Sequence, residues 1–465
     1  MNKFKLLVSN TLIFAIGTVL TKLILFLLMP LYTSVLTTEQ FGYAEILNNS
    51  VELLLPIATL CIADAVFRFA IDDDSNKTNL LSTGINLLIK GFILILILIF
   101  ILDCFYEFDY SFYLVLLYVS TAIKQLFAQF CRGIGHVKIF TISGVLGALS
   151  LLVSNLILLV IFKLEVPGYL SAIIISNIIS AVYLFIVSDL HKYISMKSVD
   201  KGLLKSMLLF SIPNVANMVS WWVNNTSSRY IILGYYGAGA AGMFTAASKL
   251  PAMINLLSSI FQQAWQYSSS KEIKNEDSGD FFTDVYKYFS SFIFISSALL
   301  LIVTPVISKF LLQGEFYSAW VFVPLLLVSA VLGSFSIFFG TFYMAVKKNT
   351  MAMISTVIGA ITNLITCLLL VPIIGVYGAL VASVVSYLFV VIFRIVNTRQ
   401  YANVNINLSK LIINLMVILF QAVILTINSR FSLLLALIML ITILIVNAKD
   451  FYGFFKIVTD RKKRE

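Results

Sequence analysis

The stretch LLSTGINLLIKGFILILILIFIL, residues 80 to 102, contains a single charged residue, Lys90, among apolar and small neutral side chains. As an α-helix it rises about 1.5 Å per residue, so it is long enough to cross a hydrocarbon core about 30 Å thick. A helix satisfies its own backbone hydrogen bonds, which lipid cannot do. The stretch therefore predicts a transmembrane helix.

Similar apolar stretches recur from residue 9 to residue 448 and predict an all-α polytopic membrane protein with about fourteen transmembrane helices. The composition agrees, since 60% of the residues are hydrophobic and 12% are charged, against about 25% charged residues in a soluble domain. The expected spans are 9–36, 41–70, 80–102, 111–131, 139–162, 167–188, 207–233, 241–267, 286–311, 318–345, 350–371, 376–397, 409–428 and 431–448.

Lys and Arg outside the spans indicate the orientation, because cytoplasmic loops retain positive charge. With the N-terminus inside, most of them fall in cytoplasmic loops and tails, and only Lys163, Lys309 and Arg430 fall in or beside external loops. We therefore expect both termini in the cytoplasm, with the basic cluster at 461–464 as a headgroup-binding tail. The membrane thus accounts for the net charge of +10 without nucleic acid as a partner.

Weak internal repeats predict two similar halves, as in many transporters. A shift of 200 residues superposes FGYA at 41–44 on AGMF at 241–244. A shift of 210 residues pairs Gly168, Leu170, Ala172 and Ser176 with Gly378, Leu380, Ala382 and Ser386. We expect an N-terminal six-helix lobe at 1–190, a cytoplasmic linker at 191–206, a C-terminal six-helix lobe at 207–398, and two additional helices with a basic tail at 399–465.

Basic residues inside the expected spans are the main functional signal, because a charge at the bilayer centre costs about 2.5 to 3.5 kcal/mol. Lys287 and Arg394 lie within about one turn of the cytoplasmic boundary, and we expect them to snorkel to the interface. The other interior cations are candidates for a cationic substrate cavity, with structural pairing to a buried acid as the alternative: Lys22, Arg68, Lys90, Lys124, Arg229 and Lys249.

Interior acids are fewer, and they offset only part of this charge. Asp64 and Arg68 have the i, i+4 spacing of an intrahelical salt bridge. Glu45 and Glu52 stand seven residues apart on one helix face and could offset Lys22 or carry a coupling cation. The remaining positive charge favours an anion with several oxygens, such as a phosphate or pyrophosphate.

A polar, aromatic stretch lies inside the seventh span, where Trp221 and Trp222 are followed by Asn224 and Asn225. Stacking and hydrogen-bonding side chains of this kind suit contact with a glycan, and a helix interface built from small polar residues is an equal alternative. The prolines at 30, 56, 213 and 251 are expected to kink helices in both lobes.

Cysteines and histidines give no sign of a metal site or of catalysis. The cysteines at 61, 104, 131 and 367 are far apart, and the histidines at 136 and 191 fall in expected loops. We expect no metal, no cofactor and no catalytic residue. Coupling to Na⁺ or H⁺ stays open.

Several short motifs in order resemble the bacterial polysaccharide repeat-unit flippases of the Wzx type, in the superfamily that also contains MATE exporters and the lipid II flippase. They are PLY at 30–32, FGYA at 41–44, ASKLP at 247–251 and GVYGALVA at 375–382. The resemblance covers essentially the whole chain, although fourteen spans rather than twelve depart from this type.

The resemblance implies a function in O-antigen or capsule biosynthesis at the bacterial cytoplasmic membrane. A cavity between the lobes would accept undecaprenyl-diphosphate carrying a short glycan on the cytoplasmic side and release it outside by alternating access. Lysines and arginines would hold the pyrophosphate, and Lys249 is the position where the family pattern and the interior charge agree best. A polysaccharide polymerase and chain-length machinery are the implied protein partners.

Two alternatives remain. A cation-coupled multidrug exporter of the same fold should have a net acidic site, whereas the interior here is net basic. A membrane glycan polymerase or ligase should have a large external loop with clustered Arg, His or carboxylates, and the expected external loops are short.

Overall fold

The structure, a computed structural model, describes residues 3–72, 75–105, 109–195, 200–273, 278–346, 348–427 and 431–462. Within these ranges the chain is helical and contains no strand, which confirms the predicted all-α class. Contacts divide it into two compact units, Met1–Trp222 and Val223–Glu465. This division falls inside a long helix, whereas the linker predicted at 191–206 includes residues 196–199, which lie outside the described ranges.

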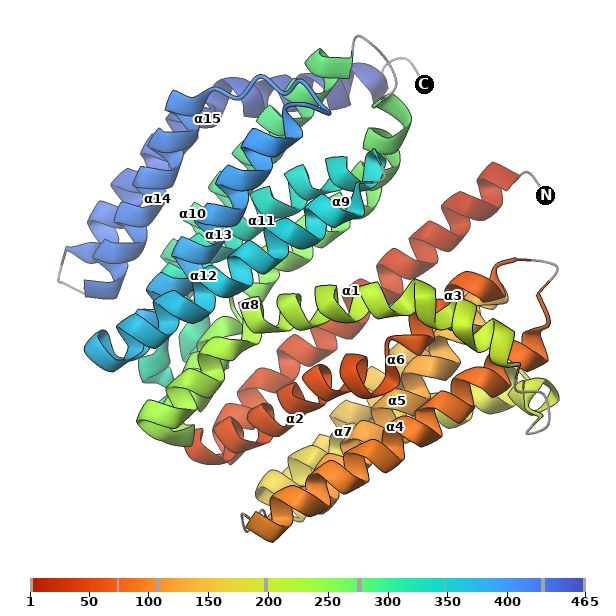
Figure 1. The fold of residues 1–465 in the computed structure, drawn as a ribbon. Coiled ribbons are helices and arrows are strands. Elements are labelled where there is room, and N and C mark those ends of the chain that lie inside the picture. The colour runs from red at the N-terminus through yellow and green to blue at the C-terminus, as the bar shows by residue number, and fades with distance from the viewer. Residues whose placement is uncertain are drawn as a thin grey trace. The chain divides into compact units, whose positions relative to one another are not determined.

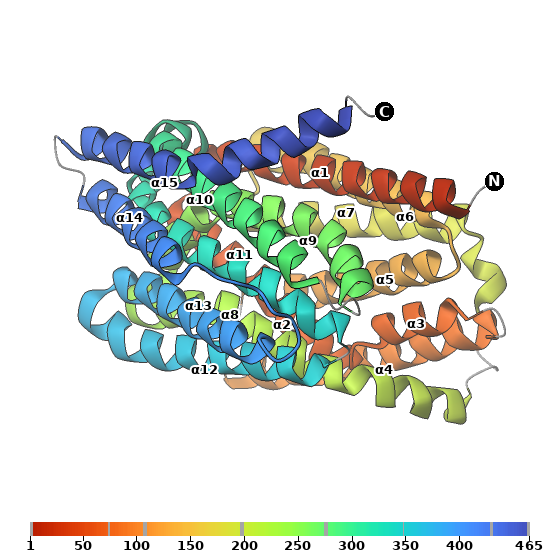
Figure 2. The ribbon, with the colours of Figure 1, turned by 90° about the horizontal axis from the view of Figure 1, so that it is seen from above.

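The first unit contains the first seven long helices and the beginning of the eighth (Figure 1). In chain order they are α1 (Lys3–Val35), α2 (Thr38–Thr59), α3 (Ile62–Ala70), α4 (Lys77–Phe105), α5 (Ser111–Gly133), α6 (Val137–Asn155), the π-helix η1 (Leu156–Ile161), α7 (Glu165–Val187), the short 3₁₀ helix η2 (Leu190–Tyr193) and α8 (Lys201–Ser248). Helix α1 packs along α6, as seen from above in Figure 2.

The second unit contains the end of α8 and all later helices. They are α9 (Ala252–Glu272), α10 (Ser278–Leu311), the 3₁₀ segment η3 (Gly314–Phe322), α11 (Val323–Ala345), α12 (Asn349–Ile374), α13 (Val376–Thr398), α14 (Leu408–Ile427) and α15 (Ser432–Lys462). The last two run side by side and pack on α10 (Figures 1 and 2). Most of the expected tail, residues 463–465, lies outside the described ranges.

The spans agree with the sequence prediction in order, but fewer of them are long and apolar enough to cross a membrane than the fourteen predicted. In the described residues, eleven helices are long and apolar enough to cross a membrane, and the bent pair α2 and α3 gives a twelfth. Two shorter apolar segments, Val19–Val35 in α1 and Ala252–Gln262 in α9, occupy the places of the first and eighth predicted spans. The protein is therefore a multi-pass membrane protein.

One hydrogen bond is repeated in both units and supports the repeat read from the sequence. The Ser176 hydroxyl on α7 donates to the carbonyl of Gly147 on α6 at 2.7 Å. Its repeat partner Ser386 on α13 donates to the carbonyl of Gly359 on α12 at 2.8 Å. Likewise α7 packs on α5 and α6, and α13 packs on α11 and α12. The predicted 210-residue shift therefore pairs structurally equivalent serines.

The second span is broken rather than continuous. Helix α2 begins with a capping box, in which the Thr37 hydroxyl accepts from the Gln40 amide and the Gln40 side chain accepts from the Thr37 amide. It contains Pro56 and ends where Leu60 and Cys61 adopt positive φ values of 50° and 53°. The chain then bends by 62° into α3. Such left-handed conformations are costly for side chains other than glycine.

The seventh and eighth predicted spans also have different ends from those expected. Helix α8 continues past residue 233 to Ser248, with non-helical dihedral angles at Gly237 (φ 80°, ψ 177°). A turn at 249–251 then separates it from α9, because Pro251 cannot continue the hydrogen-bond pattern of the preceding helix. Lys249, which we expected inside a span, therefore lies at a break in the helix.

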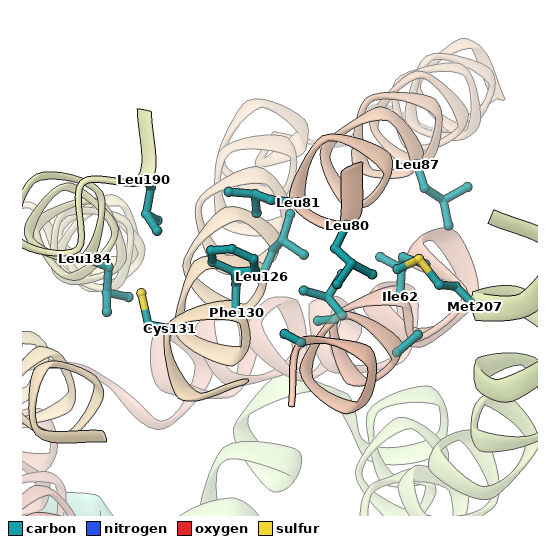
Figure 3. Close-up of a cluster of buried hydrophobic side chains, with 14 residues drawn as sticks. Ile62, Leu80, Leu81, Leu87, Leu126, Phe130, Cys131, Leu184, Leu190 and Met207 are labelled. Atoms are coloured by element: carbon teal, nitrogen blue, oxygen red, sulfur yellow. The ribbon is translucent and has the colours of Figure 1, made fainter. Parts of the chain in front are cut away.

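Side-chain packing holds the first unit together at the ends of several helices. Figure 3 shows a cluster of buried apolar side chains contributed by α3, α4, α5, α7, η2 and α8. Leu126 and Phe130 of α5 are fully buried at its centre, and Met207 of α8 joins from the other side of Ile62. Burying a side chain of this size stabilises packing chiefly by close contact, since lipid is also apolar.

Candidate functional site

Lys124 is a partly buried cation in the first unit, and its partners are neutral. Its Nζ, on α5, donates to Oδ1 of Asn177 on α7 at 2.9 Å. The Asn177 amide in turn donates to the Thr121 hydroxyl at 3.0 Å. These contacts fix the lysine without neutralising it, because an amide oxygen carries no formal charge. In the described part of the chain, no carboxylate forms an ion pair with Lys124.

Lys22 and Lys90, the other deep lysines of this unit, have exposed side chains on α1 and α4. Neither forms an ion pair with any carboxylate among the described residues. In a bilayer, exposure means contact either with lipid or with water, and water is strongly favoured for an ammonium group at depth. Both lysines therefore add positive charge without a carboxylate partner.

Arg68 differs from these lysines because its charge is balanced. Its Nη1 lies 2.8 Å from Oδ1 of Asp72, and both side chains are about half exposed. The partner expected from the sequence was Asp64, one turn earlier on the helix. The pair with Asp64 is therefore corrected to a pair with Asp72, which has the same i, i+4 spacing in the opposite direction.

Arg229 and Lys249 are the predicted cations of the second unit; Arg229 lies on α8, and Lys249 directly follows the end of this helix. The Arg229 guanidinium donates to the Ser248 hydroxyl at 3.4 Å, and Ser248 immediately precedes Lys249. Both side chains are partly buried and both have further interactions. The Arg229 guanidinium thus contacts the last residue of α8, next to the break at 249–251 where Lys249 lies.

Arg394 was expected to snorkel, and the structure shows instead that it is anchored inside the second unit. From α13 its Nη1 donates to the Ser336 carbonyl on α11 at 2.6 Å, and its Nε donates to the Ser355 hydroxyl on α12 at 2.9 Å. Gly340 leaves room for the guanidinium, since a Cβ there would lie 2.4 Å from Nη1. The sequence signal that we missed is this glycine, together with the polar pair Ser355 and Thr356.

Arg394 and Lys124 each connect helices that correspond in the repeat, although they lie on helices that do not correspond, α13 and α5. Lys124 connects α5 with α7, and Arg394 connects α13 with α11 and α12, the corresponding helices of the repeat. In both cases the partners are amide, hydroxyl or carbonyl oxygens. Lys287, by contrast, is exposed and pairs with Asp284 at 3.0 Å, in keeping with the interfacial position expected for it.

The acids predicted as charge partners have separate environments. Glu45 is buried, and its Oε1 accepts a hydrogen bond from the Tyr169 hydroxyl at 3.0 Å. Glu52, two turns later on α2, is exposed. Asp64 is partly buried on α3 and interacts electrostatically with Arg132, whose guanidinium lies 4.4 Å from the Phe67 ring centre. None of the three forms an ion pair with Lys22.

The polar, aromatic stretch of α8 contributes mainly to helix contacts. Trp222 is buried and its indole donates to the Asn49 carbonyl on α2 at 2.9 Å. Asn224 and Asn225 accept hydrogen bonds from the hydroxyls of Ser386 and Tyr387 on α13, at 2.6 and 2.7 Å. These contacts match the helix-interface alternative. Trp221, by contrast, is 53% exposed.

A metal centre built from the usual protein ligands does not occur in the described residues, where no three His, Cys, Asp or Glu side chains form a group. Taken together, Lys22, Lys90, Lys124 and Arg394 give both units positive charge that no described carboxylate balances. Such an arrangement is suited to binding a polyanion.

Comparison with known families gives a match over more than half of the chain. The profile of the family described as "Polysaccharide biosynthesis protein" matches residues 7–266. No curated protein has a sequence that matches.

Solved structures share the fold at low sequence identity. An inward-facing multidrug-resistance MATE family transporter of the MOP superfamily has a TM-score of 0.68 and 12% identity, covering 82% of this chain and 95% of its own. The lipid II flippase MurJ, in an inward closed conformation, has a TM-score of 0.67 and 14% identity, covering 96% of this chain and 99% of its own. A MOP superfamily transporter from Pyrococcus furiosus with a binding pocket of reverse polarity has a TM-score of 0.57 and 13% identity. The match covers 85% of this chain and 95% of that transporter. These likenesses establish the MOP fold.

Proposed function

Because this chain belongs to the family of polysaccharide biosynthesis proteins, we propose that it flips undecaprenyl-diphosphate-linked oligosaccharide repeat units across the bacterial cytoplasmic membrane. The transport would proceed by alternating access, without a chemical step. The family membership and the flippase-type transporter fold support transport rather than catalysis.

The observation that carries the proposal is the charge of Lys124. Its hydrogen bond to Asn177, which is itself held by the Thr121 hydroxyl, keeps the ammonium group in place and leaves its charge uncompensated. A diphosphate headgroup supplies several charged oxygens, and each hydrogen bond from an ammonium to such an oxygen is charge-assisted. Lys22 and Lys90, which belong to the same unit as Lys124, are proposed as further contacts of the diphosphate.

Glycan contact is assigned to Trp221 in this proposal, because its ring is exposed while its neighbours are engaged in helix contacts. An exposed indole ring can stack on the face of a sugar ring. A polysaccharide polymerase and chain-length machinery are proposed as partners that receive the product. The charge of the loops supports cytoplasmic termini.

A small-molecule exporter is the second candidate, because the MATE transporter has the same fold over 82% of the chain. An exporter of organic cations needs an acidic binding site. Glu45 is buried in this protein, but the described interior groups without an ion-pair partner are predominantly basic. The two candidates differ in what they predict when Lys124 loses its charge. The flippase should lose transport, whereas an exporter of organic cations should keep it.

The experiment tests Lys124 by charge and by hydrogen bonding separately. Lys124→Gln keeps a donor for Asn177 and removes the charge, whereas Lys124→Arg keeps the charge. In a strain that lacks the chromosomal copy, we expect Lys124→Gln to abolish surface polysaccharide at normal protein levels in the membrane and Lys124→Arg to retain part of it. Lys287→Gln is the matched control, since Lys287 is exposed and paired with Asp284. Wild-type polysaccharide in the Lys124→Gln strain would overturn the proposal.

A further inference from the structure

A groove runs between α12 and α13 in the second unit. These helices lie side by side, as both views show (Figures 1 and 2). The groove has a volume of about 520 Å³, within the range of small-molecule sites, about 300 to 1,000 Å³. Its apolar wall is formed by Ile358 of α12 with Phe389, Ile392, Phe393 and Val396 of α13. We call it the α12–α13 groove.

The α12–α13 groove changes from apolar to polar toward one end of the two helices. Asn397 and Gln400 complete its lining there, where α13 ends at Thr398 and α12 begins at Asn349. Phe389 lies nine residues before the end of α13, which is about 14 Å along the helix. The groove therefore reaches from the apolar interior of the span to its polar end, which the loop charges predict to be cytoplasmic.

The apolar wall is open to the surroundings of the protein. Phe389, Ile392 and Val396 are 53, 51 and 62% exposed with the whole chain present. Apolar side chains that lack neighbours on one side lose close contacts, which a matching apolar chain restores. In a bilayer this is the acyl chain of a lipid, so the polar end of the groove decides which lipid binds.

One acceptor at the polar end has no donor. Asn397 Oδ1 is buried and has no hydrogen-bond partner among the described residues. The backbone carbonyl of the same residue accepts from Gln400 Nε2 at 3.0 Å, so this amide is directed to the backbone. The terminal torsion of an asparagine side chain is broad, and a rotation about it turns Oδ1 toward the groove that Asn397 lines. A hydroxyl group in the groove would supply the missing donor.

Two exposed cations stand at the same end of the helices. Lys348 precedes the first residue of α12, and Arg399 follows the last residue of α13. Neither forms an ion pair with a carboxylate in the described part of the chain. Basic residues at the cytoplasmic end of membrane helices attract anionic lipid headgroups. The charge at this end therefore favours a lipid with a net negative charge over a zwitterionic one.

We propose that the α12–α13 groove binds an anionic phospholipid with a hydroxyl-bearing headgroup, of the phosphatidylglycerol class. One acyl chain lies along the apolar wall, the phosphate faces Lys348 and Arg399, and a headgroup hydroxyl donates to Asn397 Oδ1. This lipid is a resident of the site and not the transported molecule, so the inference does not rest on the proposed function.

The test measures lipid binding to the purified full-length protein in detergent by native mass spectrometry. Phosphatidylglycerol is compared with phosphatidylcholine of the same acyl chains, because phosphatidylcholine is zwitterionic and has no hydroxyl in its headgroup. We expect the protein to bind phosphatidylglycerol about fivefold or more tightly, since one basic residue near the membrane surface contributes about that factor. Added salt should reduce the difference.

Variants localise the bound lipid. Val396→Trp fills the groove from an exposed position and should lose binding of both lipids, while Ile373→Trp is the matched control, since Ile373 is 75% exposed at the other end of α12. Lys348→Gln combined with Arg399→Gln should bring the affinity for phosphatidylglycerol close to that for phosphatidylcholine. Asn397→Leu should weaken phosphatidylglycerol binding and leave phosphatidylcholine binding unchanged. The midpoint of thermal unfolding without added lipid reports whether each variant still folds.

Binding at the proposed diphosphate contacts instead of the groove gives a different result. In that case Lys124→Gln would lose phosphatidylglycerol and Val396→Trp would keep it, which overturns the assignment. Equal affinity of the wild type for the two lipids overturns it as well. We expect Lys124→Gln to bind phosphatidylglycerol like the wild type, whatever its effect on transport, so failure of the proposed function is distinguishable from failure of this inference.

Discussion

The contact between Gly340 and Arg394 gives a prediction whose size can be worked from the structure. Replacing Gly340 with Ala places a methyl group 2.4 Å from Nη1 and 3.2 Å from Cζ of Arg394. The guanidinium must then move, and its hydrogen bond to the Ser336 carbonyl at 2.6 Å is the first to be lost. A charge-assisted hydrogen bond contributes about 1.5 to 3 kcal/mol. Alanine is about 0.5 to 1 kcal/mol more favourable than glycine inside a helix, which offsets part of this loss.

The expected net result is a loss of about 1 to 2 kcal/mol in the free energy of unfolding, measured as a midpoint lower by a few degrees in detergent. Gly234→Ala is the matched control, because no atom lies within 4 Å of a Cβ at this position of α8. It should be neutral or slightly stabilising.

A double-mutant cycle isolates the contact. If the clash with the guanidinium is the cause, Gly340→Ala should cost much less in an Arg394→Met background, where the flexible methionine can move aside. The reasoning is refuted if Gly340→Ala costs nothing in the wild type, or if its cost is unchanged in the Arg394→Met protein.

Further predictions concern the contacts between helices. Ser176→Ala should destabilise the protein by about 0.6 kcal/mol, the average for interhelical hydrogen bonds in membranes. Ser386→Ala should cost at least as much, because its hydroxyl contacts Asn224 as well as the Gly359 carbonyl. Ser383→Ala, whose hydroxyl bonds within its own helix, should cost less, and equal midpoints for all three variants would contradict the repeat contact. Lys410 pairs with Asp450 to join α14 to α15, with side-chain exposures of 24% and 18%. Removing one partner alone, in Lys410→Met, should therefore lower the free energy of unfolding by about 3 kcal/mol or more. The double variant Lys410→Met with Asp450→Leu should recover part of this loss in thermal unfolding. If it recovers none, the ion pair is not the cause of the loss.

Sequence patterns predicted the helices well because a bilayer imposes strict length and polarity on any segment that crosses it. Stretches such as residues 80–102 allow one structure only, and α4 covers that range. The repeat was also visible, since Ser176 and Ser386 hold the same place in their Gly, Leu, Ala and Ser patterns, and each donates to a glycine carbonyl of the preceding helix. Breaks inside helices were less predictable: Leu60 and Cys61 have no local sequence signal for positive φ, and tertiary packing must hold them there.

Side-chain partners could be predicted only in part. Arg68 has an acid one turn away on either side, Asp64 and Asp72, and spacing alone cannot decide between them. Arg394 was misplaced because its distance from the membrane surface was counted along the helix, whereas the carbonyl and hydroxyls that bind it come from α11 and α12. The partners of Lys124 and of Arg394 are 38 or more residues away in the sequence. No local sequence pattern can therefore predict these contacts.

Direct binding of lipid-linked diphosphate tests the central claim, which is that uncompensated cations of the spans recognise a diphosphate headgroup. Purified wild-type protein should bind undecaprenyl diphosphate more tightly than the uncharged alcohol undecaprenol, and the preference should weaken with added salt. In Lys124→Gln the ratio of the two affinities should fall by about tenfold or more, the equivalent of about 1.4 kcal/mol. In Lys287→Gln the ratio should stay unchanged. Equal affinity for the diphosphate and the alcohol, or an unchanged preference in Lys124→Gln, would contradict the account.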